Sequence, residues 1–219
     1  MEETALFCVF SAPLRFCRIG RFCFAMKHLH YKKRSIYTMA NTNPKLSRLA
    51  KLGLLAALSV VLVFFIHFPI FPTAKFLEYD PADIPIMIAT FAFGPWYGLM
   101  TTIVVAVIQG VTVSASGGVY GIIMHIISTG TFVLVAGLLY QKHKSKKGAL
   151  IALLCGVAAW GLIMMPANLI ITPIFTGMPV EAIRAILLPI ILPFNLIKAG
   201  INATVTFLVY KSVSPLLHR

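Results

Sequence analysis

The chain has 219 residues, of which 59% are hydrophobic and 11% charged, whereas soluble domains carry about 25% charged residues. Six acidic residues cannot solvate the surface of a soluble globule of this size, so the composition predicts an all-α, polytopic membrane protein. It excludes secreted disulfide scaffolds and most soluble enzymes. The formal charge of +13 raises nucleic-acid binding as an alternative, but neither aromatic interleaving nor a soluble module accompanies the basic clusters beside the hydrophobic spans.

The first 38 residues carry seven lysines and arginines and three of the four cysteines. They contain no CxxC pair, so we expect no metal site there. Met26 and Met39 are alternative start positions, and we expect the leader to be disordered or a start-site artefact. The predicted organisation is a basic leader (residues 1–44), a membrane domain (residues 45–211) and a cytoplasmic tail (residues 212–219).

The membrane domain divides into six predicted spanning helices. A spanning helix needs about 20 apolar residues, and Leu52–Phe68 is the first candidate. Residues 84–141 hold no charged side chain over 58 residues and suit three helices, which break at residues 94–98 and 114–118. The fifth span is predicted over Gly148–Thr172 and the sixth over Val180–Tyr210, where Pro189 and Pro193 interrupt it.

Charge asymmetry predicts the orientation of these spans. Basic residues precede the first span, fill the loop Lys142–Lys147 and close the chain, so the positive-inside rule places both termini in the cytoplasm. We expect the acidic residues of the membrane domain at or near the outer face. These are Glu78, Asp80, Asp83 and Glu181.

The second span, Pro81–Phe93, is too short to cross a membrane unaided. Its 13 residues extend roughly 20 Å as a helix, against a hydrocarbon core about 30 Å thick. Irregular backbone at membrane depth is tolerated where it is buried in protein or lines a cavity. We therefore predict that Pro69–Asp83 folds back and walls a pocket that opens to the outside.

Lys198 lies inside the sixth span, where a cation costs at least about 2.5–3.5 kcal/mol. Asn195 and Asn202 fall on the same helical face, so one polar stripe points inward. One interpretation is that Lys198 pairs with a carboxylate or extends to the interface while the asparagines bind other helices. We favour a ligand-contacting stripe, because no acid lies within the membrane spans to pair with Lys198.

Three further polar residues lie within predicted spans. Asn168 follows Pro166 and either satisfies the carbonyl that this proline frees or contacts a ligand. Gln109 and His125 have no second histidine or cysteine at ligand spacing, so we assign no metal and no cofactor.

Small residues in the first span form the pattern Gly53-x-x-x-Ala57, with Ala56 beside it, and such patterns let helices approach closely. The sequence contains no phosphate-binding GxxxxGK[ST] loop, no HExxH and no GxSxG. We therefore expect no enzymatic activity, and a chain that binds a solute without an energy source of its own.

The segment from Phe71 to Pro85, which reads FPTAKFLEYDPADIP, is followed by FAFGP over residues 91–95. It resembles the substrate-binding S components of energy-coupling factor (ECF) transporters, most closely the riboflavin-specific ones. The resemblance covers residues 45–211, where Asn195-x-x-Lys198 is similar to the family's riboflavin-contacting pair and Asn168 matches another ligand contact.

The resemblance implies a six-helix bundle in the bacterial plasma membrane, an outward-facing pocket, and docking on a transmembrane coupling subunit with two ATPases. The family docks through Ala-x-x-x-Ala in the first helix, so Gly53, Ala56 and Ala57 are the expected docking residues. The candidate ligand-binding residues are Asn195, Lys198, Asn168, Asn202, Leu77, Glu78 and Asp83. Alternatives are an S component for another vitamin or for a flavin-like or nucleobase-like ligand, a membrane-embedded enzyme, or a structural membrane protein.

Overall fold

The structure is a computed structural model that describes residues 43–71, 74 and 76–217. It divides the chain into two units, residues 1–47 and 48–219, and the site lies within the second. The predicted leader, residues 1–44, therefore lies almost wholly outside the described residues.

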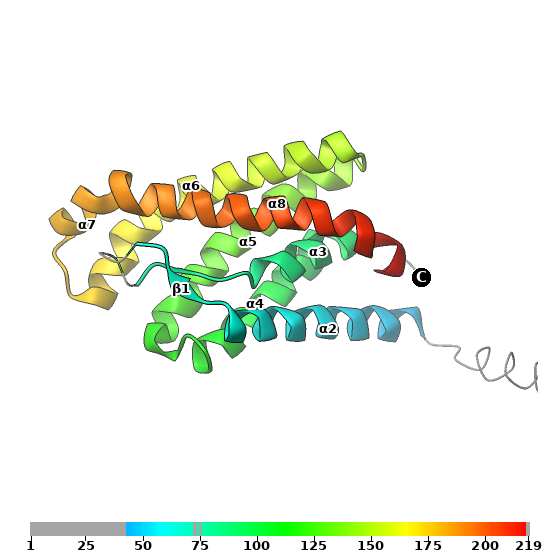
Figure 1. Ribbon diagram of the computed structural model, residues 1–219, viewed down its shortest axis with the longest axis horizontal. Helices are drawn as coiled ribbons and strands as arrows, with labels where there is room; N and C mark the ends of the chain where they lie inside the picture. The colour runs from blue at the N-terminus through cyan, green and yellow to red at the C-terminus, as the bar shows by residue number, and fades with distance from the viewer. Residues whose placement is uncertain (1–42, 72–73, 75, 218–219) are drawn as a thin grey trace, which may run out of the picture. The chain divides into compact units, whose positions relative to one another are not determined.

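The described chain is mainly helical (Figure 1). The elements in order are α2 (Pro44–Phe65), β1 (Phe68–Pro69), β2 (Glu78–Tyr79), α3 (Asp83–Phe93), α4 (Pro95–Val111), the 3-10 turn η1 (Ala115–Gly117), α5 (Gly118–Lys142), α6 (Lys146–Thr176), α7 (Val180–Ile186), the π-helical turn η2 (Leu187–Ile191) and α8 (Leu192–Leu217). Strands β1 and β2 pair antiparallel, with Phe68 opposite Tyr79.

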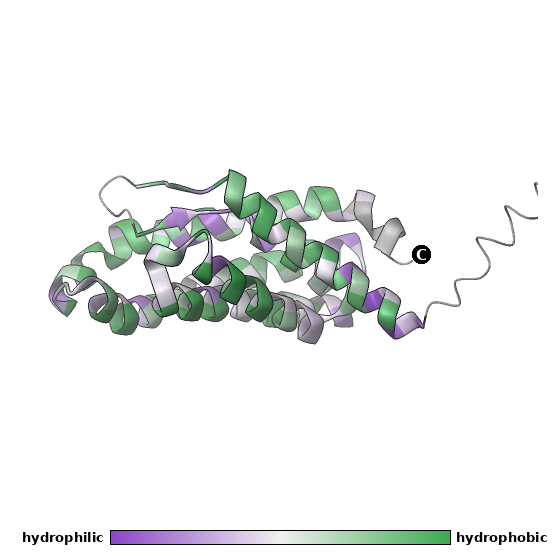
Figure 2. Ribbon diagram, turned by 90° about the horizontal axis from the view of Figure 1, so that it is seen from below, coloured by the Kyte–Doolittle hydropathy of each residue, from purple (hydrophilic) through white to green (hydrophobic). Residues whose placement is uncertain are grey.

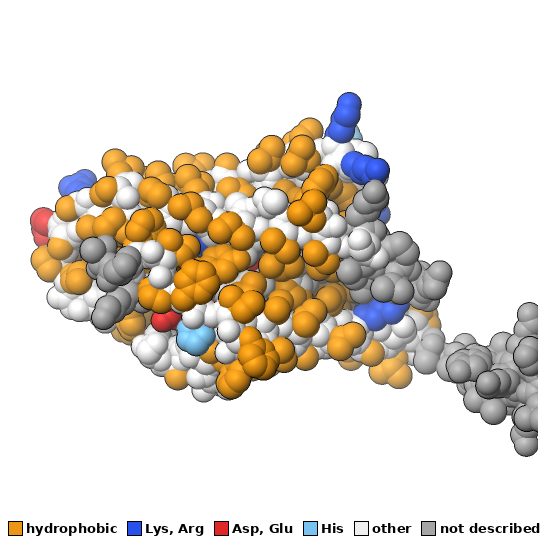
Figure 3. Space-filling model, viewed as in Figure 1, with side chains coloured by type: hydrophobic (Ala, Val, Ile, Leu, Met, Phe, Trp, Pro, Cys, Tyr) orange, Lys and Arg blue, Asp and Glu red, His pale blue; other side chains and the backbone are white. Residues whose placement is uncertain are grey.

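Four helical segments of the described chain are long and apolar enough to cross a membrane: Pro44–Phe65, Ala115–Lys142, Lys146–Thr176 and Val180–Tyr210. Helices α3 and α4 are apolar but shorter. The helices are hydrophobic along most of their length (Figure 2). Apolar side chains cover much of the face in Figure 3, while basic ones lie mostly near the α5–α6 connection and at the start of α2.

The break predicted between the second and third spans is confirmed at Gly94 and Pro95. Gly94 has φ 110°, which a residue with a side chain rarely adopts, and Pro95 opens α4 at its first turn. Within α4, Gly98 lies so close to α3 that an added Cβ would meet Thr90 Oγ1 at 2.0 Å. Glycine thus lets the two short helices pack tightly.

The bounds of two helices differ from the predictions, and one predicted interruption takes a particular form. Helix α2 ends at Phe65, three residues before the predicted end of the first span. Helix α6 runs from Lys146 to Thr176, so it extends beyond the predicted fifth span at both ends and continues through Pro173 as well as through Pro166. The predicted interruption at Pro189 takes the form of the π-helical turn η2.

The core that supports the site lies between α3, α5, α6 and α8. Its buried members include Ile86, Phe132, Trp160 and Ala199. A second cluster joins the segment after β1 to α7, η2 and α8, through Ala74, Leu77, Ile183, Leu187, Ile191 and Phe194. This second cluster holds the irregular segment against the helices.

Candidate ligand-binding cavity

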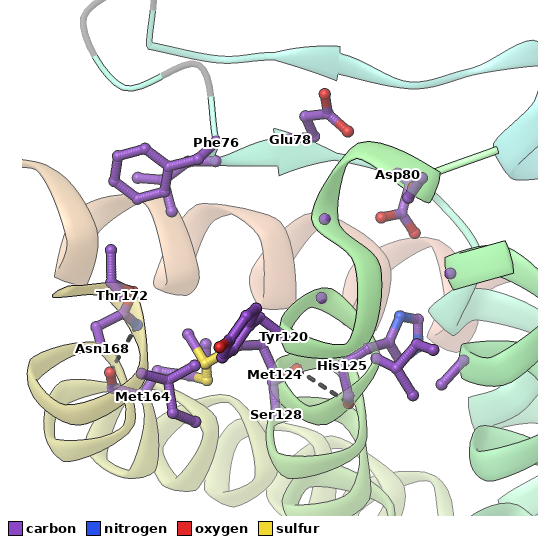
Figure 4. Close-up of a pocket in the computed structure, with 18 of the residues that line it drawn as sticks. Phe76, Glu78, Asp80, Tyr120, Met124, His125, Ser128, Met164, Asn168 and Thr172 are labelled. Carbon is purple, nitrogen blue, oxygen red and sulfur yellow. Dashed lines mark hydrogen bonds between the residues drawn. The ribbon is translucent and has the colours of Figure 1, made fainter. Parts of the chain in front are cut away.

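A cavity of about 400 Å³ lies within the helix bundle, a volume suited to a drug-sized ligand. Its wall includes Phe76, Leu77, Glu78 and Asp80, so the segment predicted to fold back does line a pocket. Figure 4 shows Phe76, Asn168 and Thr172 toward one end and Asp80 and His125 toward the other, with Tyr120 and Met124 between. The remaining lining includes further aromatic rings, Trp160, Phe175 and Phe194.

The structure brings five of the seven predicted ligand-binding residues to this cavity. They come from three parts of the chain, and they are Leu77, Glu78, Asn168, Asn195 and Lys198. Asp83 and Asn202 do not line it. They lie behind the wall in a buried hydrogen-bond network, and their contact with a ligand stays a prediction.

Lys198 pairs with a carboxylate, contrary to our premise that no acid was available. Its Nζ lies 2.8 Å from Asp80 Oδ2 and also donates to Glu78 O at 3.3 Å. Asp80 and Asp83 are 4% and 0% exposed, so they lie inside the bundle rather than on its surface, and their expected position near the outer face of the membrane stays a prediction. The physical reason is that residues 78–83 turn into the bundle, where α8 supplies donors.

Asp80 is fixed by both of its carboxylate oxygens. Oδ1 accepts from the Ala82 amide at 3.1 Å, and Oδ2 accepts from Lys198 and, at 3.5 Å, from Gln109 Nε2. Burial raises the pKa of Asp80, but the Lys198 ammonium outweighs burial and holds this pKa below its ordinary value. Asp80 is therefore ionised at neutral pH.

Asp83 and Asn202 form the network behind the wall. Asp83 accepts from Thr129 Oγ1 at 2.7 Å and from Asn202 Nδ2 at 2.9 Å. Asn202 also donates to Asp80 O at 3.2 Å and accepts from the Tyr79 hydroxyl at 3.0 Å. These bonds tie the segment between β2 and α3 to α5 and α8.

The two asparagines that line the cavity have intramolecular partners that orient their amides. Asn195 accepts from Trp160 Nε1 at 2.9 Å and donates to Ile191 O at 2.8 Å. Asn168 donates to Met164 O at 2.7 Å and accepts from Thr172 Oγ1 at 2.9 Å, so it does not cap the carbonyl freed by Pro166. An amide has two N–H groups and two oxygen lone pairs, so each keeps a donor and an acceptor for a ligand.

Gln109 and His125 also line the cavity, which our sequence interpretation did not foresee. Within the described part of the chain, Gln109 Oε1 has no hydrogen-bond partner. His125 Nε2 lies 3.5 Å from Asp83 Oδ1 without forming a hydrogen bond. No cluster of three or more metal-ligating side chains occurs among the described residues, and the absence of a cofactor stays a prediction.

The expected docking residues separate onto two faces of α2. Gly53 and Ala57 are exposed, and nothing lies within 4 Å of a Cβ added at Gly53. Ala56 is buried in the core, so the structure does not group it with the other two.

Sequence reasoning missed Tyr120 and Trp160, which lie in apolar stretches that read as ordinary core. Trp160 is 2% exposed and supplies the donor that orients Asn195. The indole N–H of a buried tryptophan usually has a hydrogen-bond acceptor, so the sequence could have indicated that Trp160 donates to a polar residue on another helix.

An aromatic cavity with a few fixed polar groups, set in a bundle of apolar helices, defines a membrane protein that binds a small solute. The chain belongs to the family of ECF transporter substrate-specific components, which matches residues 47–210. It is thus a multi-pass protein of the bacterial cell membrane and a subunit of a transporter.

Two curated relatives are riboflavin transporters. FmnP of Bacillus subtilis (strain 168) is 30% identical over 180 residues, covering 78% of this chain and 94% of the relative. RibU of Staphylococcus aureus (strain TCH60) is 26% identical over 178 residues, covering 78% and 93%. A solved S component of a bacterial ECF transporter superposes with a TM-score of 0.69 at 26% identity, covering 80% of this chain and 99% of that structure.

Proposed function

We infer that this chain is a riboflavin-binding S component, which takes up riboflavin together with an ECF energy-coupling module. The observation that carries the inference is the agreement between its relatives, which are riboflavin transporters, and a cavity lined by Asn168, Asn195 and Lys198. We propose that the chain itself is not an enzyme, since its sequence contains no phosphate-binding GxxxxGK[ST] loop, and that the ATPases of the coupling module supply the energy.

The chemistry of the cavity suits riboflavin. The molecule has an apolar tricyclic ring, an edge of alternating donors and acceptors, and a hydroxylated tail. Aromatic side chains such as Tyr120 and Phe194 offer faces for the ring. The free donor and acceptor of each asparagine match the polar edge. Lys198, with two of its three N–H groups engaged, has one left for a carbonyl or a hydroxyl.

We propose that six helices cross or enter the membrane with both termini in the cytoplasm. The connection between α5 and α6 lies at the same end of the bundle as the end of α8 (Figure 1). That connection carries the lysine cluster, which the positive-inside rule assigns to the cytoplasm. Helices α3 and α4 together act as a short re-entrant pair or as two tilted spans.

The ligand assignment is tested by purifying the full chain in detergent. A riboflavin binder co-purifies as a yellow protein with flavin absorbance and quenched flavin fluorescence. Asn195→Ala and Lys198→Ala should each weaken binding by about 1–3 kcal/mol, or about 5- to 150-fold. Thr204→Val is the matched control, because Thr204 is exposed on α8 and bonds only to its own helix. A colourless protein that binds no riboflavin at micromolar concentration refutes the assignment, and binding of another vitamin replaces it.

We propose that the exposed face bearing Gly53 and Ala57 docks on the transmembrane coupling subunit. A small-residue face lets another helix approach closely. Gly53→Leu should therefore preserve riboflavin binding by the isolated chain but impair uptake in cells. Leu54→Ala, at an exposed neighbouring position of the same helix, is the control. Normal uptake by Gly53→Leu would contradict this docking face.

A further inference from the structure

The wall of the cavity holds an ion pair between Lys198 and Asp80 that bears on which flavins the cavity binds. Lys198 is the one lysine or arginine among the described residues that line the cavity, and its ammonium is paired with Asp80. The side chains of both residues are nearly buried, at 12% and 6% exposure. A cation in this position would attract any anionic group on a ligand, so the pairing decides what the cavity accepts.

We propose that Asp80 is a specificity-determining residue: by pairing with Lys198 it withholds the ammonium from anionic ligands, so that the cavity selects flavins without a phosphate group. The proposal rests on the proposed function, since it concerns which flavin the same cavity prefers. Asp80 acts through Lys198 and through its own charge, so it requires no direct contact with the ring.

Hydrogen bonds hold the Asp80 carboxylate in place beside Lys198, so the ion pair is a fixed part of the cavity wall. One oxygen is held by the Ala82 amide and the other by Lys198, while Asn202 holds the backbone carbonyl of Asp80. With both carboxylate oxygens and the backbone carbonyl of Asp80 held, moving the carboxylate away from Lys198 when an anion enters would break these hydrogen bonds. A ligand phosphate would have to compete with a preformed bond of 2.8 Å in a poorly solvated place.

The net charge of the cavity lining also disfavours a ligand with a phosphate group. Its described lining carries two carboxylates, Glu78 and Asp80, against one ammonium, so the formal charge is negative when His125 is neutral. A phosphate monoester adds about −1.5 to −2 at neutral pH. Riboflavin is uncharged and meets no such repulsion, whereas its 5′-phosphate meets it wherever the phosphate lies within the cavity.

The test compares the affinities of purified variants for riboflavin and for riboflavin 5′-phosphate, by fluorescence quenching at fixed ionic strength. Asp80→Asn keeps the shape of the side chain but removes its charge, and with it the ion pair that holds Lys198. The ratio compared is the dissociation constant for riboflavin 5′-phosphate divided by that for riboflavin. We expect this ratio to fall by about tenfold or more in Asp80→Asn, as one gained charge-assisted hydrogen bond to the phosphate implies. If Asp80 had only a structural role, the substitution would weaken the binding of both ligands by the same factor and leave the ratio unchanged.

Glu78→Gln is the matched charge control. It removes the same formal charge from the lining, but among the described residues the Glu78 carboxylate forms no ion pair, so Lys198 stays paired with Asp80. We expect a clearly smaller change in the ratio than for Asp80→Asn. An equal change in both variants would overturn the role of the ion pair.

Two further variants keep the proposal testable if Asp80→Asn folds poorly. Lys198→Gln leaves a cavity with carboxylates and no ammonium, so the ratio should move by about threefold or more against the phosphate. The double variant Asp80→Asn/Lys198→Gln should lose the gain seen in Asp80→Asn. An unchanged ratio in Lys198→Gln overturns the proposal, whereas failure of the wild-type chain to bind riboflavin overturns the proposed function instead.

Discussion

Asn202→Leu tests whether the network behind the cavity or the ligand itself accounts for the polar stripe on α8. Asn202 is fully buried and does not line the cavity. Its amide accepts from Tyr79 and donates to Asp80 and Asp83, which joins α8 to the segment that walls the cavity. Leucine has a similar size and removes these bonds while leaving most of the packing in place.

The magnitude follows from what the substitution leaves behind. Two neutral hydrogen bonds contribute about 0.5–1.5 kcal/mol each, and the bond to the Asp83 carboxylate contributes about 1.5–3 kcal/mol. Asp83 is fully buried and would keep Thr129 as its short hydrogen-bond donor. Because the three bonds share one side chain and are not additive, we expect a loss of about 3–5 kcal/mol in the free energy of unfolding.

The assay is thermal unfolding of the purified chain in detergent, with riboflavin affinity measured at a temperature where the variant is still folded. Thr204→Val is the control, since Thr204 lies two residues away on an exposed face. We expect Asn202→Leu to unfold well below the control, and saturating riboflavin to restore part of the difference by binding the native state. A variant with control-like stability but no riboflavin binding would instead place Asn202 in direct contact with the ligand.

The remaining predictions concern single contacts around the cavity. Trp160→Phe removes the donor that orients Asn195, so riboflavin binding should weaken by about 0.5–1.5 kcal/mol in a fluorescence titration; unchanged affinity would contradict this role. Gly98→Ala drives a Cβ against Thr90, so the thermal midpoint should fall by an amount equivalent to about 1–3 kcal/mol, and wild-type stability would contradict the tight α3–α4 packing. The pKa of Asp80 lies below its ordinary value of about 3.9, so its ion pair stabilises the fold at neutral pH and is lost as the pH falls through the folded-state pKa. The difference in thermal midpoint between wild type and Asp80→Asn should therefore shrink between about pH 5 and pH 2, and a constant difference would refute that sign.

Much of the fold could be predicted because strong local signals coincide with real boundaries. Gly94 followed by Pro95 ends one helix and begins the next, since glycine allows the positive φ and proline fits the first turn. The passage of α6 through Pro173 could not be predicted from the same rule, since the predicted fifth span ends at Thr172. Proline inside an apolar helix is tolerated when neighbouring groups satisfy the freed backbone, and that depends on tertiary contacts.

The candidate site was only partly predictable for a related reason. Helical periodicity places Asn195, Lys198 and Asn202 on one face of α8, but it cannot say which of them reaches a cavity. The structure shows that the first two do, while the third lies behind the wall. The pairing of Lys198 with Asp80 spans 118 residues of sequence and depends on the path of an irregular segment, for which no local pattern exists.

The pairing also explains why the irregular segment and the polar stripe belong together. A lone ammonium in the bundle would be costly, and so would two lone carboxylates. The segment carrying Asp80 and Asp83 supplies the partners that α8 needs, and α8 supplies the donors that the segment needs. The same segment contributes Leu77 and Glu78 to the wall of the cavity. The contacts that compensate the buried charges therefore also hold this wall in place. Substitutions in the network should consequently change stability and ligand affinity together, whereas substitutions at ligand-facing groups outside it should change affinity alone.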